Sequence, residues 1–217
     1  MPGWPRSLRP SRRRFDKTMS EADRIVGLYE RHAHAFDRLR SKHFFERSWI
    51  DRFAGQLAEG SRVLDLGCGS GEPLAACLLE RGMKVTGIDS SPTLIELCRE
   101  RLPQGDWQVA DMRELSLGRT FDGILAWHSF FHLTPDAQRA MFPVFAAHAA
   151  GHAVLMFTSG PSEGVAIGTF EGEPLYHASL APDEYRRLLA ENGFEVIVHM
   201  AEDPECGGAT VWLARRI

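Results

Sequence analysis

The sequence has little cysteine, no long apolar run and no metal-site motif. Its 217 residues include four cysteines that form neither a CxxC pair nor a zinc-ligand spacing, namely Cys68, Cys77, Cys98 and Cys206. No stretch approaches the roughly 18 apolar residues of a membrane helix, and the arginine-rich start lacks the apolar core of a secretory signal. HExxH is also missing, so no metal is predicted. We therefore expect a cytoplasmic protein with reduced thiols.

Positive charge is concentrated at the start of the chain. Residues 1–18 hold six basic side chains against one acidic, a net charge of +5, so the rest of the chain carries −9 for an overall charge of −4. The segment is rich in Pro and Arg, and Met19 opens a stretch typical of a natural start. We predict a flexible, dispensable extension rather than an arm for nucleic acid or lipid headgroups. Because the acidic remainder repels polyanions, we expect neither a nucleic acid nor a membrane partner.

Short apolar runs alternate with amphipathic segments after residue 57. Strands are expected at 62–66, 84–89, 107–111, 121–127 and 152–158, with helices between them. This alternation requires a mostly parallel sheet covered by helices on both faces, which is the doubly wound, Rossmann-like α/β class. Two further strands, 194–200 and 210–216, are joined by a loop of about nine residues, too short for a parallel crossover, so they pair antiparallel.

Proline and hydroxyl residues mark two helix starts. Ser91 is a predicted N-cap followed by Pro92, and Thr134 is a second one followed by Pro135. Pro143 falls inside the second of these helices and is expected to kink or split it.

The pattern indicates a single domain over residues 19–217. Residues 21–57 read as a helical cap at its amino-terminal end. Residues 159–181 are rich in Gly and Pro and irregular in pattern, so this segment is the candidate for a lid that contacts a substrate.

The glycine-rich stretch VLDLGCGSGEP, residues 63–73, follows the first strand. It lacks the third glycine of the dinucleotide fingerprint and the lysine of a P-loop. Asp65 and Glu72 flank the turn and would repel a pyrophosphate, whereas an ammonium or sulfonium group would be attracted. Asp89 ends the second strand, 22 residues after Gly67, where a carboxylate can accept both ribose hydroxyls. A ribose site beside a loop that disfavours phosphate points to S-adenosylmethionine (SAM).

Four motifs in order resemble those of the class I SAM-dependent methyltransferases, of the broad small-molecule type. VLDLGCGSG is similar to the first motif of the family, VTGIDSS to the second, QVADMREL to the third, and FDGILAWHSFFHL to the segment on and after the fourth strand. The resemblance covers about residues 25–217 and is strongest over 62–133. It implies a seven-stranded sheet whose last strand is inserted antiparallel.

The resemblance also implies a set of residues that bind SAM, with S-adenosylhomocysteine (SAH) as the product. Asp65 holds the methionine ammonium group, and Asp89 takes the ribose hydroxyls. The remaining cofactor-binding residues that the resemblance implies are Gly67, Cys68 and Gly69 in the loop, Ser90 or Ser91 with Asp111 and Met112 around the adenine, and Trp127 at the methionine end. Tyr29 lies in a segment similar to the amino-terminal helix that closes over the cofactor in relatives, and Arg40 is a candidate to pair with the cofactor carboxylate.

Each of these assignments has a structural alternative. Asp111 would otherwise cap the turn that begins at Met112, and Trp127 would be a core aromatic residue. Cys68 is interpreted as a small packing residue rather than a reactive thiol. Tyr29 and Arg40 would otherwise be surface residues of the helical cap.

Three histidines are candidates for contact with the methyl acceptor. Methyl transfer is an in-line displacement, and an acceptor hydroxyl, amine or thiol must lose a proton, which suits a histidine. His128 and His132 follow the fourth strand, and His177 lies in the candidate lid. Each would otherwise be a structural histidine.

Missing motifs narrow the acceptor. No [DNS]-P-P-[FYW] tetrapeptide follows the fourth strand and no Pro-Cys dipeptide is present, which disfavours methylation of nucleobases and amide nitrogens. We expect a small-molecule acceptor with an oxygen, nitrogen or sulfur nucleophile. The alternatives are a catalytically silent module that binds SAM or SAH, and a nicotinamide-dependent oxidoreductase. The sequence leaves the acceptor and the oligomeric state open.

Overall fold

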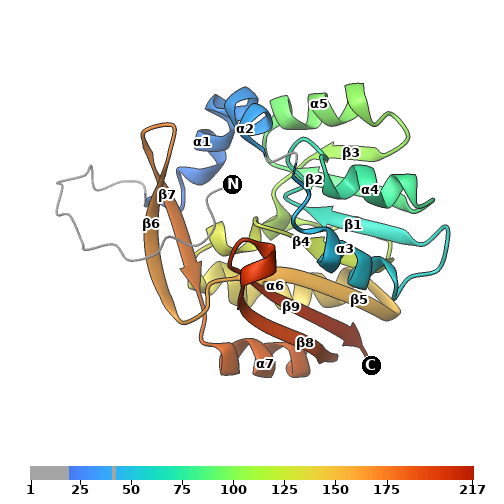
Figure 1. Ribbon diagram of the computed structural model, residues 1–217. Helices are drawn as coiled ribbons and strands as arrows, with labels where there is room; N and C mark the ends of the chain where they lie inside the picture. The colour runs from blue at the N-terminus through green and yellow to red at the C-terminus, as the bar shows by residue number, and fades with distance from the viewer. Residues whose placement is uncertain (1–19, 41–42) are drawn as a thin grey trace.

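A seven-stranded sheet lies at the centre of the computed structural model, which describes residues 20–40 and 43–217 (Figure 1). The predicted extension, residues 1–18, lies outside the described residues. Strand order is β3-β2-β1-β4-β5-β9-β8. The strands are β1 (Arg62–Leu66), β2 (Lys84–Asp89), β3 (Asp106–Val109), β4 (Phe121–Ala126), β5 (Ala149–Ser159), β8 (Phe194–Asp203) and β9 (Ala209–Arg216).

The pairing pattern confirms the predicted fold class. β1, β2, β3, β4 and β5 pair in parallel. β9 inserts between β5 and β8 and pairs antiparallel with both. The short β8–β9 connection, which includes the 3₁₀ turn η3 (Pro204–Cys206), forces this reversal because a parallel crossover needs a longer chain.

Helices cover both faces of the sheet. One face carries α3 (Arg47–Ala54), α4 (Leu74–Glu80) and α5 (Pro92–Arg101), and the other carries α6 (Pro135–His148) and α7 (Pro182–Glu191). The predicted caps are confirmed: Ser91 Oγ accepts the N–H of Leu94, and Thr134 Oγ1 accepts the N–H of Ala137, each at 3.2 Å. Pro143 does not split α6, which continues through it as one helix.

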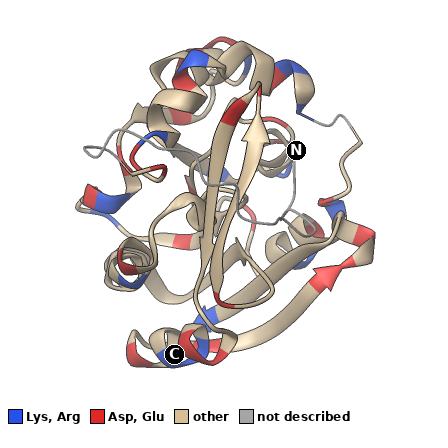
Figure 2. Ribbon diagram, turned by 90° about the vertical axis from the view of Figure 1, so that its left-hand side faces the viewer, with Lys and Arg blue, Asp and Glu red and all other residues tan. Residues whose placement is uncertain are grey.

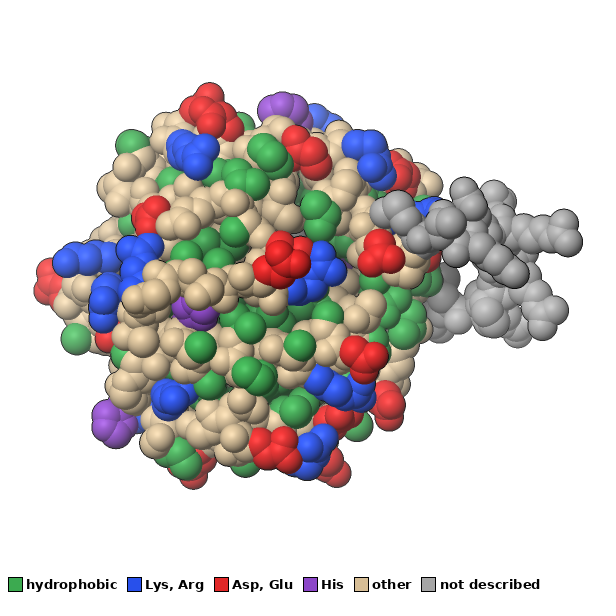
Figure 3. All heavy atoms as spheres, turned by 180° about the vertical axis from the view of Figure 1, so that it is seen from behind, with side chains coloured by type: hydrophobic (Ala, Val, Ile, Leu, Met, Phe, Trp, Pro, Cys, Tyr) green, Lys and Arg blue, Asp and Glu red, His purple; other side chains and the backbone are tan. Residues whose placement is uncertain are grey.

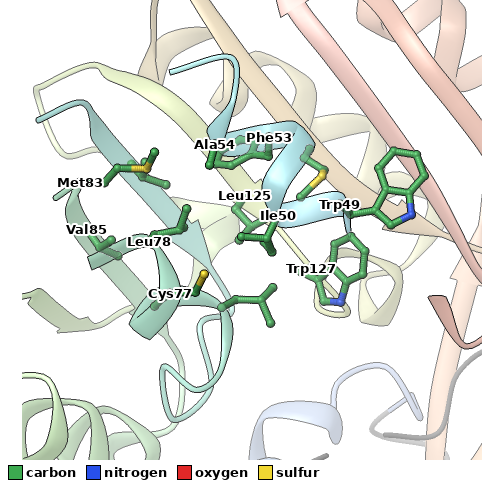
Figure 4. Packing of buried hydrophobic residues seen from close by; sticks show 14 of the residues in the cluster. Trp49, Ile50, Phe53, Ala54, Cys77, Leu78, Met83, Val85, Leu125 and Trp127 are labelled. Atoms are coloured by element: carbon green, nitrogen blue, oxygen red, sulfur yellow. The ribbon is translucent and has the colours of Figure 1, made fainter. Parts of the chain in front are cut away.

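Each face has its own apolar core. On the α3–α4 side, Trp49, Ile50 and Phe53 from α3 pack with residues such as Leu78 and Leu125, as Figure 4 shows. The other face is aromatic and buries Phe130, Phe142, Phe145, Phe157 and Trp212. Burial of a large side chain stabilises the fold by about 1.5–3 kcal/mol, so these two clusters hold the sheet rigid beneath the site.

The segment predicted to be irregular, 159–181, is a regular β-hairpin. β6 (Gly164–Phe170) pairs antiparallel with β7 (Glu173–Ser179). The two-residue turn has positive φ at Glu171 and at Gly172, a conformation that matches the twist of a hairpin. The prediction of irregularity was wrong because the apolar residues that alternate on β6, Val165 and Ile167, face outward and glycines interrupt the pattern.

The hairpin and two short helices stand over the carboxyl ends of the parallel strands. α1 (Ile25–Arg31) and α2 (Ala33–Leu39) lie beside the far end of the hairpin in Figure 1, and Figure 2 shows the hairpin from its outer side. A third apolar cluster joins these elements with α5; it includes Leu28, Phe36, Leu94, Phe170 and Leu175. Together they roof the edge of the sheet where ligands bind in this architecture. No helix in the described ranges has both the length and the apolar character needed to cross a membrane.

Candidate functional site

A pocket opens between the carboxyl ends of β1, β2 and β4 and the overlying helices α1 and α2. It encloses about 1150 Å³, part of which is open to solvent. Of the residues predicted for the site, those that line it are Tyr29, Arg40, Asp65, Gly67, Cys68, Gly69, Asp89, Ser90, Asp111, Met112, Trp127, His128 and His132. The packing of α1 over the sheet brings together residues that are 103 positions apart, as the Tyr29–His132 pair shows.

The glycine loop is packed tightly against the pocket. Gly67 has φ +74°, and a Cβ atom at this position would lie 2.3 Å from the Cβ of Ser129. The N–H groups of Gly67 and Cys68 both donate to the carbonyl of Ile88. The Ser129 hydroxyl donates to the carbonyl of Leu66 at 2.6 Å, so this side chain holds the loop from the opposite side. The backbone can therefore approach a ligand closely, and a side chain at Gly67 has no room.

Asp89 is held by the loop that it faces. Its Oδ2 accepts the N–H of Gly69 at 3.0 Å, and its Oδ1 accepts the N–H of Ser91 at 2.9 Å. Burial raises the pKa of Asp89, and these N–H groups oppose the rise. Each carboxylate oxygen keeps a lone pair for a further donor, so the side chain is oriented to accept ligand hydroxyl groups.

Asp65 is the acidic group beneath the loop and is almost fully buried. Burial and the negative charge of Asp89 raise its pKa to about 7, while the positive charge of Arg40 opposes the rise. A ligand cation beside Asp65 would favour the ionised form. The site is thus suited to a group such as an ammonium.

Two residues that line the pocket, Arg40 and Trp127, each carry a nitrogen donor without a hydrogen-bonding partner in the described residues. The Nη1 atom of Arg40 and the Nε1 atom of Trp127 are buried, and neither has a hydrogen-bonding partner in the described part of the chain. Arg40 is not a surface residue, since it is only 9% exposed. In Figure 4 the indole nitrogen of Trp127 lies on the edge of the ring turned away from Trp49. Buried donors that the fold itself leaves unsatisfied are candidates for ligand contacts.

Asp111 both lines the pocket and caps the turn that begins at Met112, the two alternatives that the sequence left open. It lines the pocket, and its Oδ1 also accepts the N–H of Arg113, which caps the turn η1 (Met112–Glu114). The Arg113 guanidinium holds both carboxylate oxygens and is the first cause of the lowered pKa of Asp111. The sequence analysis missed Arg113. The signal was its position two residues after Asp111, which is close enough for the arginine side chain to reach back to the carboxylate. A ligand amino group at Asp111 has to share the carboxylate with Arg113.

The three candidate histidines differ in position. His132 lies in η2 (Phe130–His132), and burial lowers its pKa to about 3. His128 has φ +51°, its N–H donates to Thr158 Oγ1 at 2.9 Å, and burial with the charge of Arg40 lowers its pKa to about 3. His177 does not line the pocket: β7 turns it inward, where its ring lies 4.9 Å from that of His132. Burial lowers the pKa of His177 to about 4.

Low pKa values limit what these histidines can do. All three rings are neutral near pH 7, and they are weaker bases than an exposed histidine. They are therefore suited to orient a bound molecule by hydrogen bonds rather than to hold a proton. In the described ranges there is also no group of three or more His, Cys, Asp or Glu side chains placed to bind a metal ion.

Comparisons with known proteins agree with this geometry. A family model described as a methyltransferase domain matches residues 63–150. The 27-O-demethylrifamycin SV methyltransferase of Amycolatopsis mediterranei is 32% identical over 197 residues, which cover 83% of this chain and 72% of that protein. The magnesium-protoporphyrin O-methyltransferase of Rhodobacter capsulatus is 33% identical over 108 residues, 47% of this chain and 46% of that one. The chain spans less than half the length of several curated relatives it matches.

A solved structure shows the same fold. The 1,6-didemethyltoxoflavin-N1-methyltransferase of Burkholderia thailandensis, with 1,6-didemethyltoxoflavin and SAH bound, superposes with a TM-score of 0.72 at 20% identity. The match covers 93% of each chain.

Proposed function

The chain belongs to the class I SAM-dependent methyltransferases, and on this basis we propose that it transfers the methyl group of SAM to a small-molecule acceptor. The observation that carries the proposal is Asp89, whose carboxylate is oriented by the N–H groups of Gly69 and Ser91 beside a glycine loop flanked by acids. Such a site accepts ribose hydroxyls and disfavours phosphate.

The residues present fit the cofactor. Asp65 would hold the ammonium group of the methionine part, and Asp89 would accept the ribose hydroxyls. The unpartnered Nη1 of Arg40 supplies a cationic donor of the kind that a carboxylate needs. Met112 and Asp111 line the part of the pocket left for the adenine.

Positioning and exclusion of water account for the chemistry. When bound, SAM would supply an activated methyl group: the acceptor atom would bond to it in line as the carbon–sulfur bond breaks, SAH would leave, and the acceptor proton would pass to water at the open side of the pocket. The chain contributes a pocket built on the carboxyl ends of the strands and partly covered by α1, and the alignment of bound groups and partial exclusion of water both favour a displacement. His128 stands at the pocket as a neutral ring fixed through its backbone by Thr158, so it would orient the acceptor. The acceptor atom is an oxygen, nitrogen or sulfur nucleophile.

Charge supports a small acceptor rather than a nucleic acid. Residues 160–181 around the hairpin include three glutamates and no Lys or Arg, and Figure 2 marks acidic residues in red at both ends of the hairpin. On the face shown in Figure 3, acidic and basic side chains are interspersed without a basic stripe.

The unpaired state of all four cysteines supports a cytoplasmic location.

Thermal unfolding with SAM, SAH, NAD and NADP tests the proposal. A ligand at about 100 times its dissociation constant stabilises the folded state by about 2.7 kcal/mol, which raises the midpoint by roughly 5–11 °C for a domain of this size. We expect a rise with the two adenosyl ligands alone, lost in Asp89→Ala and kept in the control Asp136→Ala, whose side chain is 96% exposed. A rise with NAD but not with SAM would contradict the assignment. If the adenosyl ligands do raise the midpoint, a screen for methyl transfer to small molecules separates an enzyme from a silent SAM-binding module.

A further inference from the structure

The buried carboxylate of Glu46 is not used by the reaction proposed above. Glu46 directly precedes α3 at the N-cap position, yet its side chain makes no capping hydrogen bond. It is fully buried, which is rare for an acidic side chain without a cationic partner. Its Oε1 forms an ion pair with Nη2 of Arg40 at 2.6 Å, and neither carboxylate oxygen has a hydrogen-bonding partner in the described residues, so Arg40 is the partner that the structure offers this buried charge. The carboxylate is therefore directed at the end of α2 rather than at its own helix.

Arg40 connects this carboxylate to the pocket. One of its terminal nitrogens, Nη2, pairs with Glu46, while the other, Nη1, is buried without a hydrogen-bonding partner in the described residues. The same side chain lines the pocket, and its charge acts on the pKa values of Asp65 and His128. The guanidinium thus lies between a fixed anion on one side and the ligand space on the other.

The loop between β8 and β9 lies near Glu46. Trp49, one turn along α3, donates its indole N–H to Asp203 Oδ2 at 2.7 Å, which ties this loop to α3. Cys206 in η3 is buried; burial raises the pKa of its thiol, and the charges of Glu46 and Asp203 add to the rise. The loop is therefore part of the surroundings in which the Glu46 side chain is fully buried.

We infer that Glu46 is a positioning residue: it holds Arg40 so that Nη1 meets the carboxylate of the methionine part of SAM. A guanidinium has a planar fork, so fixing Nη2 on Glu46 also fixes the direction of Nη1. Without Glu46 the long side chain gains other rotamers, and ordering it again weakens binding. This role rests on the proposed function and concerns the amino-acid half of the cofactor alone.

Calorimetric titration with two probes separates this role from a general effect on folding. SAH carries the amino-acid carboxylate, whereas 5′-methylthioadenosine has the same adenosine and thioether but no amino acid. We expect Glu46→Gln to weaken SAH binding about tenfold or more and 5′-methylthioadenosine binding less than twofold. Glu96→Gln is the matched control, because Glu96 lies on the surface of α5 with its side chain 62% exposed, and it should change neither affinity. Equal weakening of both probes, or no weakening, overturns the inference.

A double-substitution cycle tests whether Glu46 acts through Arg40. In an Arg40→Met background, Glu46→Gln should leave SAH affinity unchanged, and it should raise the unfolding midpoint because it removes a buried carboxylate that has lost its partner. If Glu46→Gln alone does not fold, Glu46→Asp decides, because it keeps the buried negative charge but shortens its reach to Arg40: it should weaken SAH binding and leave 5′-methylthioadenosine binding within twofold. Equal weakening of the two probes by Glu46→Asp overturns the inference, and a wild type that binds neither probe overturns the proposed function instead.

Discussion

The hydroxyl of Tyr29 lies 2.9 Å from Nε2 of His132, and Nδ1 of the same ring lies 2.7 Å from the backbone carbonyl of Tyr176. A carbonyl can only accept, so Nδ1 carries the proton and Nε2 accepts from the tyrosine. One imidazole ring thus joins α1, η2 and β7 over the pocket. A second connection lies nearby, where Glu173 on β7 pairs with Arg31 and His32.

Tyr29→Phe should loosen this roof. It leaves Nε2 of a buried histidine without a donor, which costs about 1–2 kcal/mol and lowers the unfolding midpoint by roughly 2–8 °C. Amide hydrogen exchange in α1 and β7 should speed up more than exchange in the central strands. Tyr176→Phe is the control, since it keeps the backbone carbonyl that His132 uses. Equal losses in the two variants would argue against the connection.

The buried His132 should make the free energy of unfolding fall as the pH is lowered. Burial lowers its pKa to about 3 in the folded state, against an ordinary value of 6.5, so the unfolded chain binds the proton first. Its contribution to stability is complete above pH 6.5 and is lost as pH falls toward 3, by at most about 1.4 kcal/mol per pH unit. Denaturant unfolding of His132→Gln between pH 7 and 5 should show a shallower loss than wild type. His152→Gln, at an exposed position, should keep the wild-type slope.

Asp65 should have the opposite effect on the pH dependence of stability, lowering the free energy of unfolding as the pH rises. Burial and Asp89 raise its pKa to about 7 from an ordinary 3.8, so the folded state holds the proton more tightly than the unfolded chain. The contribution is complete below pH 3.8 and is lost as pH rises through 7. Relative to wild type without ligand, Asp65→Asn should therefore gain stability as pH rises from 5 to 8. An unchanged difference between the two proteins across this range would show that Asp65 does not titrate there.

Gly67→Ala should abolish ligand binding because of a steric clash with Ser129, in addition to the backbone strain of a positive φ. The new Cβ would lie 2.3 Å from Ser129. Gly118 also has positive φ, +62°, but a Cβ at that position would have nothing within 4 Å; Gly118→Ala should cost only the strain of about 1–2 kcal/mol. Thermal unfolding with SAH should show a normal ligand-induced rise for Gly118→Ala and none for Gly67→Ala.

Local patterns were sufficient to predict the central sheet and to predict that the glycine loop and Asp89 lie together at its edge. Apolar periodicity and loop length predict the parallel strands and the antiparallel final pair, because a short connection allows only one direction. The glycine loop and the distance to Asp89 predict which side chains meet at the edge of the sheet, because parallel strands end there together. Both depend on neighbours within one or two elements.

What covers that edge depends on long-range packing. The hairpin 164–179 was not predicted, because its outward apolar residues and its glycines hide the alternation that marks a strand. The tautomer of His132 depends on the carbonyl of Tyr176, 44 positions away, and the buried pair of Arg40 and Glu46 depends on how α3 packs. Short-range pattern in the chain therefore specifies the sheet and the place of Asp89 at its edge, while the elements that cover this edge and the partners of their charged and titratable groups follow from contacts between distant segments, which no local pattern encodes.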